Sequence, residues 1–303
     1  MLIRSSGLVI ALAVTMSAAL TAQNAAKPTT VGGCPAEPAA FHACALEKAK
    51  TFTPPRTRSG KPDLQGYWRG RLAQAFSVEG VSGNEPLVGS RVMPWEKAPP
   101  MIVDPPDGKI PYQQWAIPIG RIGVNHKQYV DPRTTCGSGG VPRLALQDAD
   151  QILQPDGDQF VVWLFEDHHV QRVIAMDGRP QLGTGIKVTN GDSRGRWEGN
   201  TLVIDVNNFN GYNWFDDSGN FYTDTAHIVE RLTMIDPDTI HYEVRVEDPK
   251  AYTRPWTLVW ALVREKEQGF ELLEEACREG QRDLDSLLKA GFKYYFDPPW
   301  RGR

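Results

Sequence analysis

Residues 158–263 are a series of short apolar segments separated by tight turns, and this pattern points to a sheet-rich fold. Residues 160–165 are apolar on both alternating faces, as in a strand that is covered on both sides. Residues 240–247 alternate apolar and polar side chains, which is typical of a half-buried strand. By the same reasoning we expect strands at residues 169–175, 225–233 and 256–263, a Gly-Asn turn that leads into a strand within residues 196–206, and a short C-terminal helix at 281–290.

Successive strands with tight turns predict a mainly β protein, in which an antiparallel meander closes into a barrel or packs as a sandwich. Before this region, prolines interrupt residues 70–135, where we expect long ordered loops with short strands. Residues 23–60 are rich in Pro, Ala and Thr and are expected to form an extended lead-in with a local disulfide. Residues 61–303 are then a single β-rich domain.

Residues 1–22 have the pattern of a cleaved signal peptide, with Arg4 before an apolar run that ends in small residues. We expect cleavage after Ala22, with Ala19 as the alternative site. The apolar run is short for a membrane span, so an uncleaved anchor helix is the less favoured interpretation. The chain is therefore predicted to be periplasmic or secreted, with no membrane span.

Four cysteines follow the signal peptide, and an even number in an exported chain favours disulfides. Three pairings are possible. We favour Cys34–Cys44 as a local bridge and Cys136–Cys277 as a bridge that closes a long loop. The alternative is a metal thiolate site or a catalytic thiol, but no C-x-x-C spacing supports it.

Charge and motifs exclude several classes of function. The formal net charge is −4 with no basic cluster, so we expect no nucleic-acid partner. The motifs G-x-S-x-G, H-E-x-x-H, the Walker loop and the dinucleotide fingerprint are all absent. We therefore expect no cofactor and a small molecule as ligand or substrate, and the oligomeric state is left open.

One strand carries the candidates for acid–base chemistry. Glu230 shares an otherwise apolar face with Ile228 and Leu232, and burial there would raise its pKa unless a partner compensates. Arg172 is the expected partner, and a purely structural pair is the alternative. His227 points to the opposite face, which disfavours a His227–Glu230 dyad. The full set of catalytic candidates is His227, Asp224, Glu230, Arg172 and His169.

His168 and His169 are expected on a strand, where adjacent imidazoles point to opposite faces, so no metal site is assigned to them. Aromatic residues are dense in the β-rich region. Some barrels line a ligand cavity with such side chains, although core packing is the commoner use of Trp. The candidate ligand-binding residues are Trp163, Trp197, Tyr212, Trp214 and Trp256.

Several blocks resemble a known group of proteins. Residues 60–68, Gly-Lys-Pro-Asp-Leu-Gln-Gly-Tyr-Trp, are similar to the G-K-P-D-L-x-G-x-W opening of an uncharacterised family of secreted bacterial proteins. Residues 195–203 (GRWEGNTLV), 223–232 (TDTAHIVERL) and 251–257 (AYTRPWT) fit the same family. The resemblance implies export and a single domain but no settled activity. Gly66 and Trp68 also resemble the G-x-W of lipocalin-like (calycin) barrels, in which the Trp plugs the base of the barrel.

The sequence therefore predicts an exported protein that binds a small apolar or aromatic molecule in a β-barrel cavity. The alternative is a cofactor-independent enzyme, a lyase, isomerase or hydrolase, that uses His, Asp and Glu for acid–base chemistry in the same cavity. A third possibility is an interaction protein with no small ligand.

Overall fold

The computed structural model describes residues 30–73, 75–82, 84–86, 92–94, 97–122, 129, 131–146, 148–275, 289 and 291. The expected signal peptide and Cys277 lie outside the described residues, as does nearly all of the C-terminal helix expected at 281–290. Among the described residues, no helix has both the length and the apolar character needed to cross a membrane.

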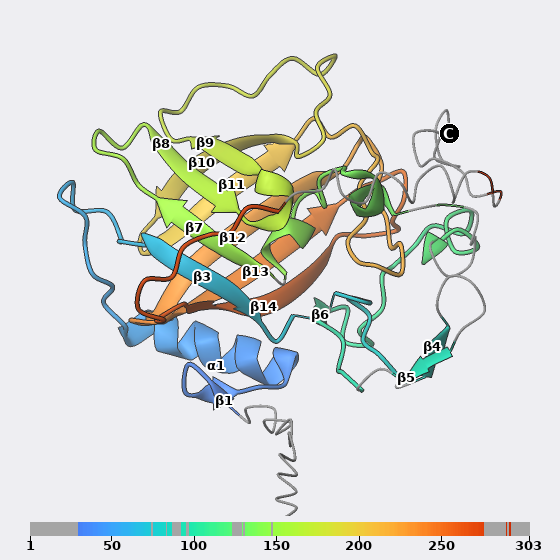
Figure 1. Ribbon diagram of the computed structural model, residues 1–303, viewed down its shortest axis with the longest axis horizontal. Coiled ribbons are helices and arrows are strands. Elements are labelled where there is room, and N and C mark those ends of the chain that lie inside the picture. Colours follow the sequence, from blue (N-terminus) through green and yellow to red (C-terminus); the bar gives the residue numbers. More distant parts are fainter. Residues whose placement is uncertain are drawn as a thin grey trace, which may run out of the picture.

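Nine strands form a closed barrel of mixed direction (Figure 1). They are β3 (Gly66–Arg71), β7 (Ala149–Leu153), β8 (Phe160–Phe165), β9 (Gln171–Ala175), β10 (Asp192–Glu198), β11 (Thr201–Asn207), β12 (His227–Asp236), β13 (Thr239–Glu247) and β14 (Trp256–Arg264). Their order around the barrel is β13-β12-β11-β10-β9-β8-β7-β3-β14, and the pairing of β14 with β13 closes the ring. The predicted β-barrel is confirmed, and the sandwich alternative is excluded.

One pairing departs from the expected antiparallel meander. β9 and β10 run parallel, with Arg194 beside Ala175. A tight hairpin joins antiparallel strands, whereas parallel neighbours need a longer crossover connection. Residues 176–191 provide this connection between β9 and β10. The other barrel pairings are antiparallel.

The remaining elements lie around the barrel. They are β1 (Thr30–Val31), β2 (Cys34–Pro35), α1 (Pro38–Thr51), β4 (Asn84–Pro86), β5 (Val92–Pro94), β6 (Ile102–Asp104) and the short 3-10 helices η1 (Pro132–Thr135), η2 (Arg143–Ala145) and η3 (Asp167–His169). β6 extends the sheet by pairing with β14. The described part of residues 70–135 therefore contains short strands between loops, as the sequence predicts.

Alternation along each strand fills the barrel with large side chains. On β13 the predicted inner face is confirmed, because its four apolar side chains are fully buried. Fully buried interior residues from the other strands include Trp68, Trp163, Ile204, Leu232 and Trp260. The core is therefore aromatic, and its rings meet edge to face, as between Tyr242 and Trp260 at 4.5 Å between centroids.

Trp68 lies near one end of the barrel, next to the end of β14. Its indole N–H donates to the Leu64 carbonyl at 2.9 Å, and the guanidinium of Arg264 lies 4.2 Å from its ring centroid. Gly66 has a φ of +131°, and a Cβ there would come within 2.3 Å of the Arg264 side chain. Glycine is thus required for Arg264 to cover Trp68. This placement agrees with what the G-x-W resemblance implies, and the lipocalin-like relationship itself stays a prediction.

The expectation of an extended lead-in is wrong for residues 38–51, which form α1. The helix begins at Pro38, and the Glu37 side chain accepts the N–H groups of Ala39 and Ala40 at 3.2 and 2.7 Å. Alanine is also the best helix former. Buried side chains of α1, Phe41 among them, pack against outward-facing residues of the barrel wall.

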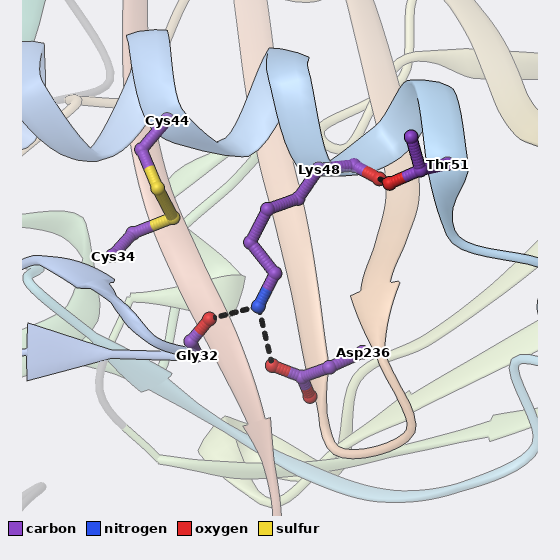
Figure 2. Close-up of a disulfide and its surroundings, with 6 residues drawn as sticks. All are labelled: Gly32, Cys34, Cys44, Lys48, Thr51 and Asp236. Atoms are coloured by element: carbon purple, nitrogen blue, oxygen red, sulfur yellow. Dashed lines mark hydrogen bonds and ion pairs between the residues drawn. A yellow bond between two sulfur atoms is a disulfide. The ribbon is translucent and has the colours of Figure 1, made fainter.

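Covalent and polar contacts fix α1 in place (Figure 2). The predicted disulfide between Cys34 and Cys44 is present. The Lys48 amine donates to the Gly32 carbonyl at 2.5 Å and lies 3.7 Å from the Asp236 carboxylate at the end of β12. Cys136 is also disulfide-bonded, and its predicted partner lies outside the described residues.

Candidate functional site

A charged cluster occupies the barrel interior. Arg172 on β9 forms a two-pronged ion pair with Glu230 on β12, at 3.0 Å (Nη1–Oε1) and 2.5 Å (Nη2–Oε2). Arg172 also donates to the Ser193 hydroxyl at 3.0 Å, and the Tyr242 hydroxyl donates to Glu230. Glu230 is completely buried and Arg172 is 5% exposed. The predicted partnership of these two residues is confirmed, and four strands supply the cluster.

The local charges set the protonation states in this cluster. Burial opposes the charge on Arg172, but Glu230 outweighs it and raises the pKa of Arg172. Burial, together with the negative charge of Glu230, raises the pKa of Tyr242 well above 10, so its phenol stays a hydrogen-bond donor. Glu230 thus has two hydrogen-bond partners inside the barrel, Arg172 and Tyr242.

Asp150 on β7 is a second interior carboxyl group, and the sequence reasoning missed it. Its side chain is completely buried, and neither oxygen has a hydrogen-bond partner among the described residues. Burial raises the pKa of Asp150 well above 3.8, although the Trp163 indole and the charge of Arg69 act in the opposite direction. The Trp163 indole is near enough to influence Asp150 but lies outside direct hydrogen-bond geometry. Asp150 thus holds its proton more tightly inside the barrel than a solvent-exposed aspartate does.

Other buried polar atoms also lack hydrogen-bond partners within the described part of the chain, among them Trp163 Nε1, Arg172 Nε and the Tyr222 hydroxyl. Arg172 pairs across the strands with Trp163, and its guanidinium lies 5.7 Å from the indole centroid. Native proteins leave few buried polar atoms unpaired, and bound water or a ligand usually satisfies those that protein groups do not. These buried atoms therefore need water or a ligand as a hydrogen-bond partner.

The candidate ligand-binding aromatics divide between several places. Trp163 belongs to the interior cluster, where its ring meets Tyr242 at 5.8 Å between centroids. Trp256 is fully buried and packs against Phe215 of the loop that connects β11 with β12. Trp214 is buried in the same loop, whereas Trp197 and Tyr212 are half-buried. Of the five, only Trp163 is joined to the charged cluster by the contacts described above.

Three acid–base candidates lie outside the cluster. His227 faces the outside of the barrel, as predicted, and contacts the Asp205 carboxylate at 2.5 Å. Asp224 forms an exposed ion pair with Lys250 at 3.0 Å. His169 is exposed in η3. None of them joins Glu230, so the proposed His–Asp–Glu combination is not assembled in the barrel.

The expected strand at residues 169–175 begins two residues late, at Gln171. His168 and His169 instead have φ values of +54° and +51° within η3. These left-handed conformations are incompatible with an extended strand, so the argument from opposite strand faces does not hold for them.

Two adjoining clefts lie outside the barrel, with volumes of about 410 and 360 Å³, and Glu79 and Arg121 line both. The Glu79 carboxylate accepts the Ile110 N–H at 2.9 Å, and burial raises the pKa of the neighbouring Tyr112 well above 10. The clefts suit a polar ligand, but their described lining lacks an unpaired buried acid comparable to Asp150. The sequence predicts ordered loops with short strands here and no binding site.

Asp150 could have been found from the sequence. Asp150 shares one face of residues 149–153 with the apolar Ile152, and a polar residue on an apolar face is the same signal that singled out Glu230. Among the described residues, side chains that could bind a metal meet at two places, His42 with His241 and Glu243, and Asp167 with His168 and Glu275.

No protein-family model matches this chain, and no curated protein matches it significantly. The resemblance to secreted bacterial proteins therefore stays a prediction, and the functional argument rests on the barrel interior.

Proposed function

We propose that this protein is an exported β-barrel that binds a small apolar or aromatic molecule in its interior through a polar group at Asp150. The observation that carries the proposal is the completely buried Asp150 carboxyl group, whose oxygens have no partner among the described residues. Export is supported by the signal-peptide pattern of residues 1–22 and by the Cys34–Cys44 disulfide.

The unpaired atoms define the ligand chemistry. Trp163 Nε1 and Arg172 Nε are donors that require an acceptor. A neutral Asp150 can donate its own proton and accept one hydrogen bond at the other oxygen. The surrounding wall is aromatic, with Trp163, Tyr242 and Trp260 in edge-to-face contact. A phenol combines a ring for this wall with a hydroxyl that both donates and accepts.

Phenol and toluene make a matched pair of probes, because they differ by the hydroxyl group that Asp150 would recognise. We expect phenol to raise the midpoint of thermal unfolding of the wild-type protein more than toluene does at equal concentration. Asp150→Leu should abolish this preference, because it replaces the carboxyl group with an apolar side chain of similar size. Asp224→Asn is the control, since it neutralises an exposed carboxylate far from the cluster.

Equal effects of phenol and toluene on the wild-type protein would contradict recognition at Asp150. So would an unchanged phenol preference in Asp150→Leu. If neither probe shifts the midpoint at millimolar concentration, the unpaired atoms are satisfied by water and the proposal is wrong.

A second candidate function is acid–base catalysis, and the raised pKa of the buried Asp150 favours it specifically. A carboxylic acid that burial keeps protonated can serve as a general acid near neutral pH. Asp150→Asn keeps a similar size and hydrogen-bonding capacity but carries no transferable acid proton. An enzyme would therefore lose turnover of a bound molecule in this variant while still binding it, and mass spectrometry of the released molecule measures that loss.

A further inference from the structure

His42, His241 and Glu243 come together on the outside of the barrel, where α1 crosses β13. His42 Nδ1 and His241 Nε2 are hydrogen-bonded to each other at 3.0 Å, so that one ring nitrogen donates and the other accepts. One ligand atom from each of the three side chains lies within 4.8 Å of the other two. His241 is 3% exposed, whereas His42 and Glu243 are half-buried at the edge of α1. The group is therefore sheltered on one side and open to an entering ion on the other.

The spacing of the two imidazoles is close to that of zinc ligands. Zinc binds histidine nitrogens at about 2.0–2.1 Å, so two such ligands at a tetrahedral angle lie about 3.3 Å apart. The two nitrogens, now 3.0 Å apart, would have to move apart by only a few tenths of an ångström to bind zinc. The ring centroids are 5.1 Å apart with an interplanar angle of 35°.

The position of His42 is fixed without any ion. Cys44, two residues further along α1, is joined to Cys34, and Lys48 ties the same helix to Gly32 and Asp236 (Figure 2). His241 is fixed within β13, whose two neighbours in the barrel are β12 and β14. Ligands held in place before binding lose little freedom when an ion enters.

We propose that His42, His241 and Glu243 form a binding site for a divalent transition-metal ion, zinc by preference, which links α1 to the barrel wall. Two imidazoles and a carboxylate are a donor set that zinc accepts, and three protein ligands leave a fourth position for water. Arg231 is the cross-strand neighbour of Glu243, but its guanidinium pairs with Glu198 at 2.9 Å. Much of its charge is therefore neutralised away from the site.

The second group of possible ligands is a weaker candidate. Asp167 accepts from Arg133 at 2.7 Å and contacts the His168 ring at 2.6 Å. The guanidinium already occupies the carboxylate that an ion would need, and its positive charge opposes a cation.

The test titrates chelator-treated protein with zinc chloride alone. Isothermal titration calorimetry measures the affinity and the number of ions bound, and thermal unfolding measures the change in stability. We expect one zinc ion per chain and a raised unfolding midpoint. Cobalt(II) should give the visible absorption of a four-coordinate nitrogen and oxygen site. His42→Gln should lower the zinc affinity by about 100-fold or more, since loss of an outer-shell partner alone costs about 10–100-fold.

Glu243→Gln is the second variant, and it should also weaken zinc binding. His227→Gln is the matched control, because it removes another half-buried histidine of the outer barrel surface that contacts a carboxylate. The proposal is overturned if the folded wild-type protein binds no zinc, or if His42→Gln binds zinc as tightly as the control. It is also overturned if binding survives in His42→Gln but is lost in His168→Gln, which would place the ion at the second group.

Discussion

Replacing Arg172 with methionine would leave the Glu230 carboxylate inside the barrel with the Tyr242 hydroxyl as its remaining described partner. The substitution removes both prongs of the ion pair and the hydrogen bond to Ser193. Breaking a buried pair by removing one partner costs about 3–5 kcal/mol, because the remaining charge stays desolvated. We therefore expect Arg172→Met to lower the free energy of unfolding by about 4 kcal/mol at neutral pH.

Removing both charges should cost less than removing one. In the double variant Arg172→Met/Glu230→Leu no charge of the pair remains buried, and the main loss is the partner of the Tyr242 hydroxyl. An unpaired buried hydroxyl costs about 1–3 kcal/mol, so the double variant should be more stable than Arg172→Met. The two substitutions are therefore expected to be strongly non-additive.

Urea unfolding followed by tryptophan fluorescence measures these differences. Arg196→Met is the control, since Arg196 pairs with Asp205 and Glu198 at 2.7 and 2.8 Å but its side chain is 51% exposed. Its loss should cost less than about 1 kcal/mol. If Arg172→Met and Arg196→Met destabilise the protein equally, or if the two interior substitutions are additive, the buried-pair reasoning is refuted.

Three further predictions follow from named contacts. The folded-state pKa of Asp150 is raised above its unfolded value of about 3.9, so the folded state binds this proton more tightly. The stability that this proton contributes is therefore lost as the pH rises above about 4. Asp150→Asn should remove this decline in urea unfolding between pH 4 and 7, and equal pH slopes for both proteins would contradict the assignment. Replacing Cys34 and Cys44 with alanine should cost about 3 kcal/mol in the chain-entropy model for a sequence separation of 10, and an unchanged melting temperature would argue against it. Arg264→Met should cost about 0.5–2 kcal/mol and make Trp68 more accessible to acrylamide quenching, whereas unchanged quenching would show that Arg264 does not cover the ring.

The barrel could be predicted because its strands carry their own local signals. The alternation in β13 identifies an inner and an outer face without any knowledge of the partner strands. Glu230 stands out because its neighbours on the same face are apolar, and the same rule points to Arg172. Asp150 obeys this rule too, but its strand is short and follows a long loop region, which hides the pattern.

Other features depend on contacts between distant segments. The parallel pairing of β9 with β10 follows from the path of residues 176–191, which alternation does not describe. His42 and His241 are separated by 199 positions, and no local signal brings them together. The helix α1 is different, because the Glu37–Pro38 start and the alanines after it are local signals that composition alone obscured.

Native mass spectrometry of the oxidised protein tests the central claim most directly. The protein is first treated with chelator, so that a metal ion adds nothing to its mass, and is then measured before and after incubation with phenol and again after denaturation. We expect an excess mass of one small molecule that disappears on denaturation and is less populated in Asp150→Leu. Equal native and denatured masses of the folded wild-type protein, with and without phenol, would contradict a ligand-binding barrel.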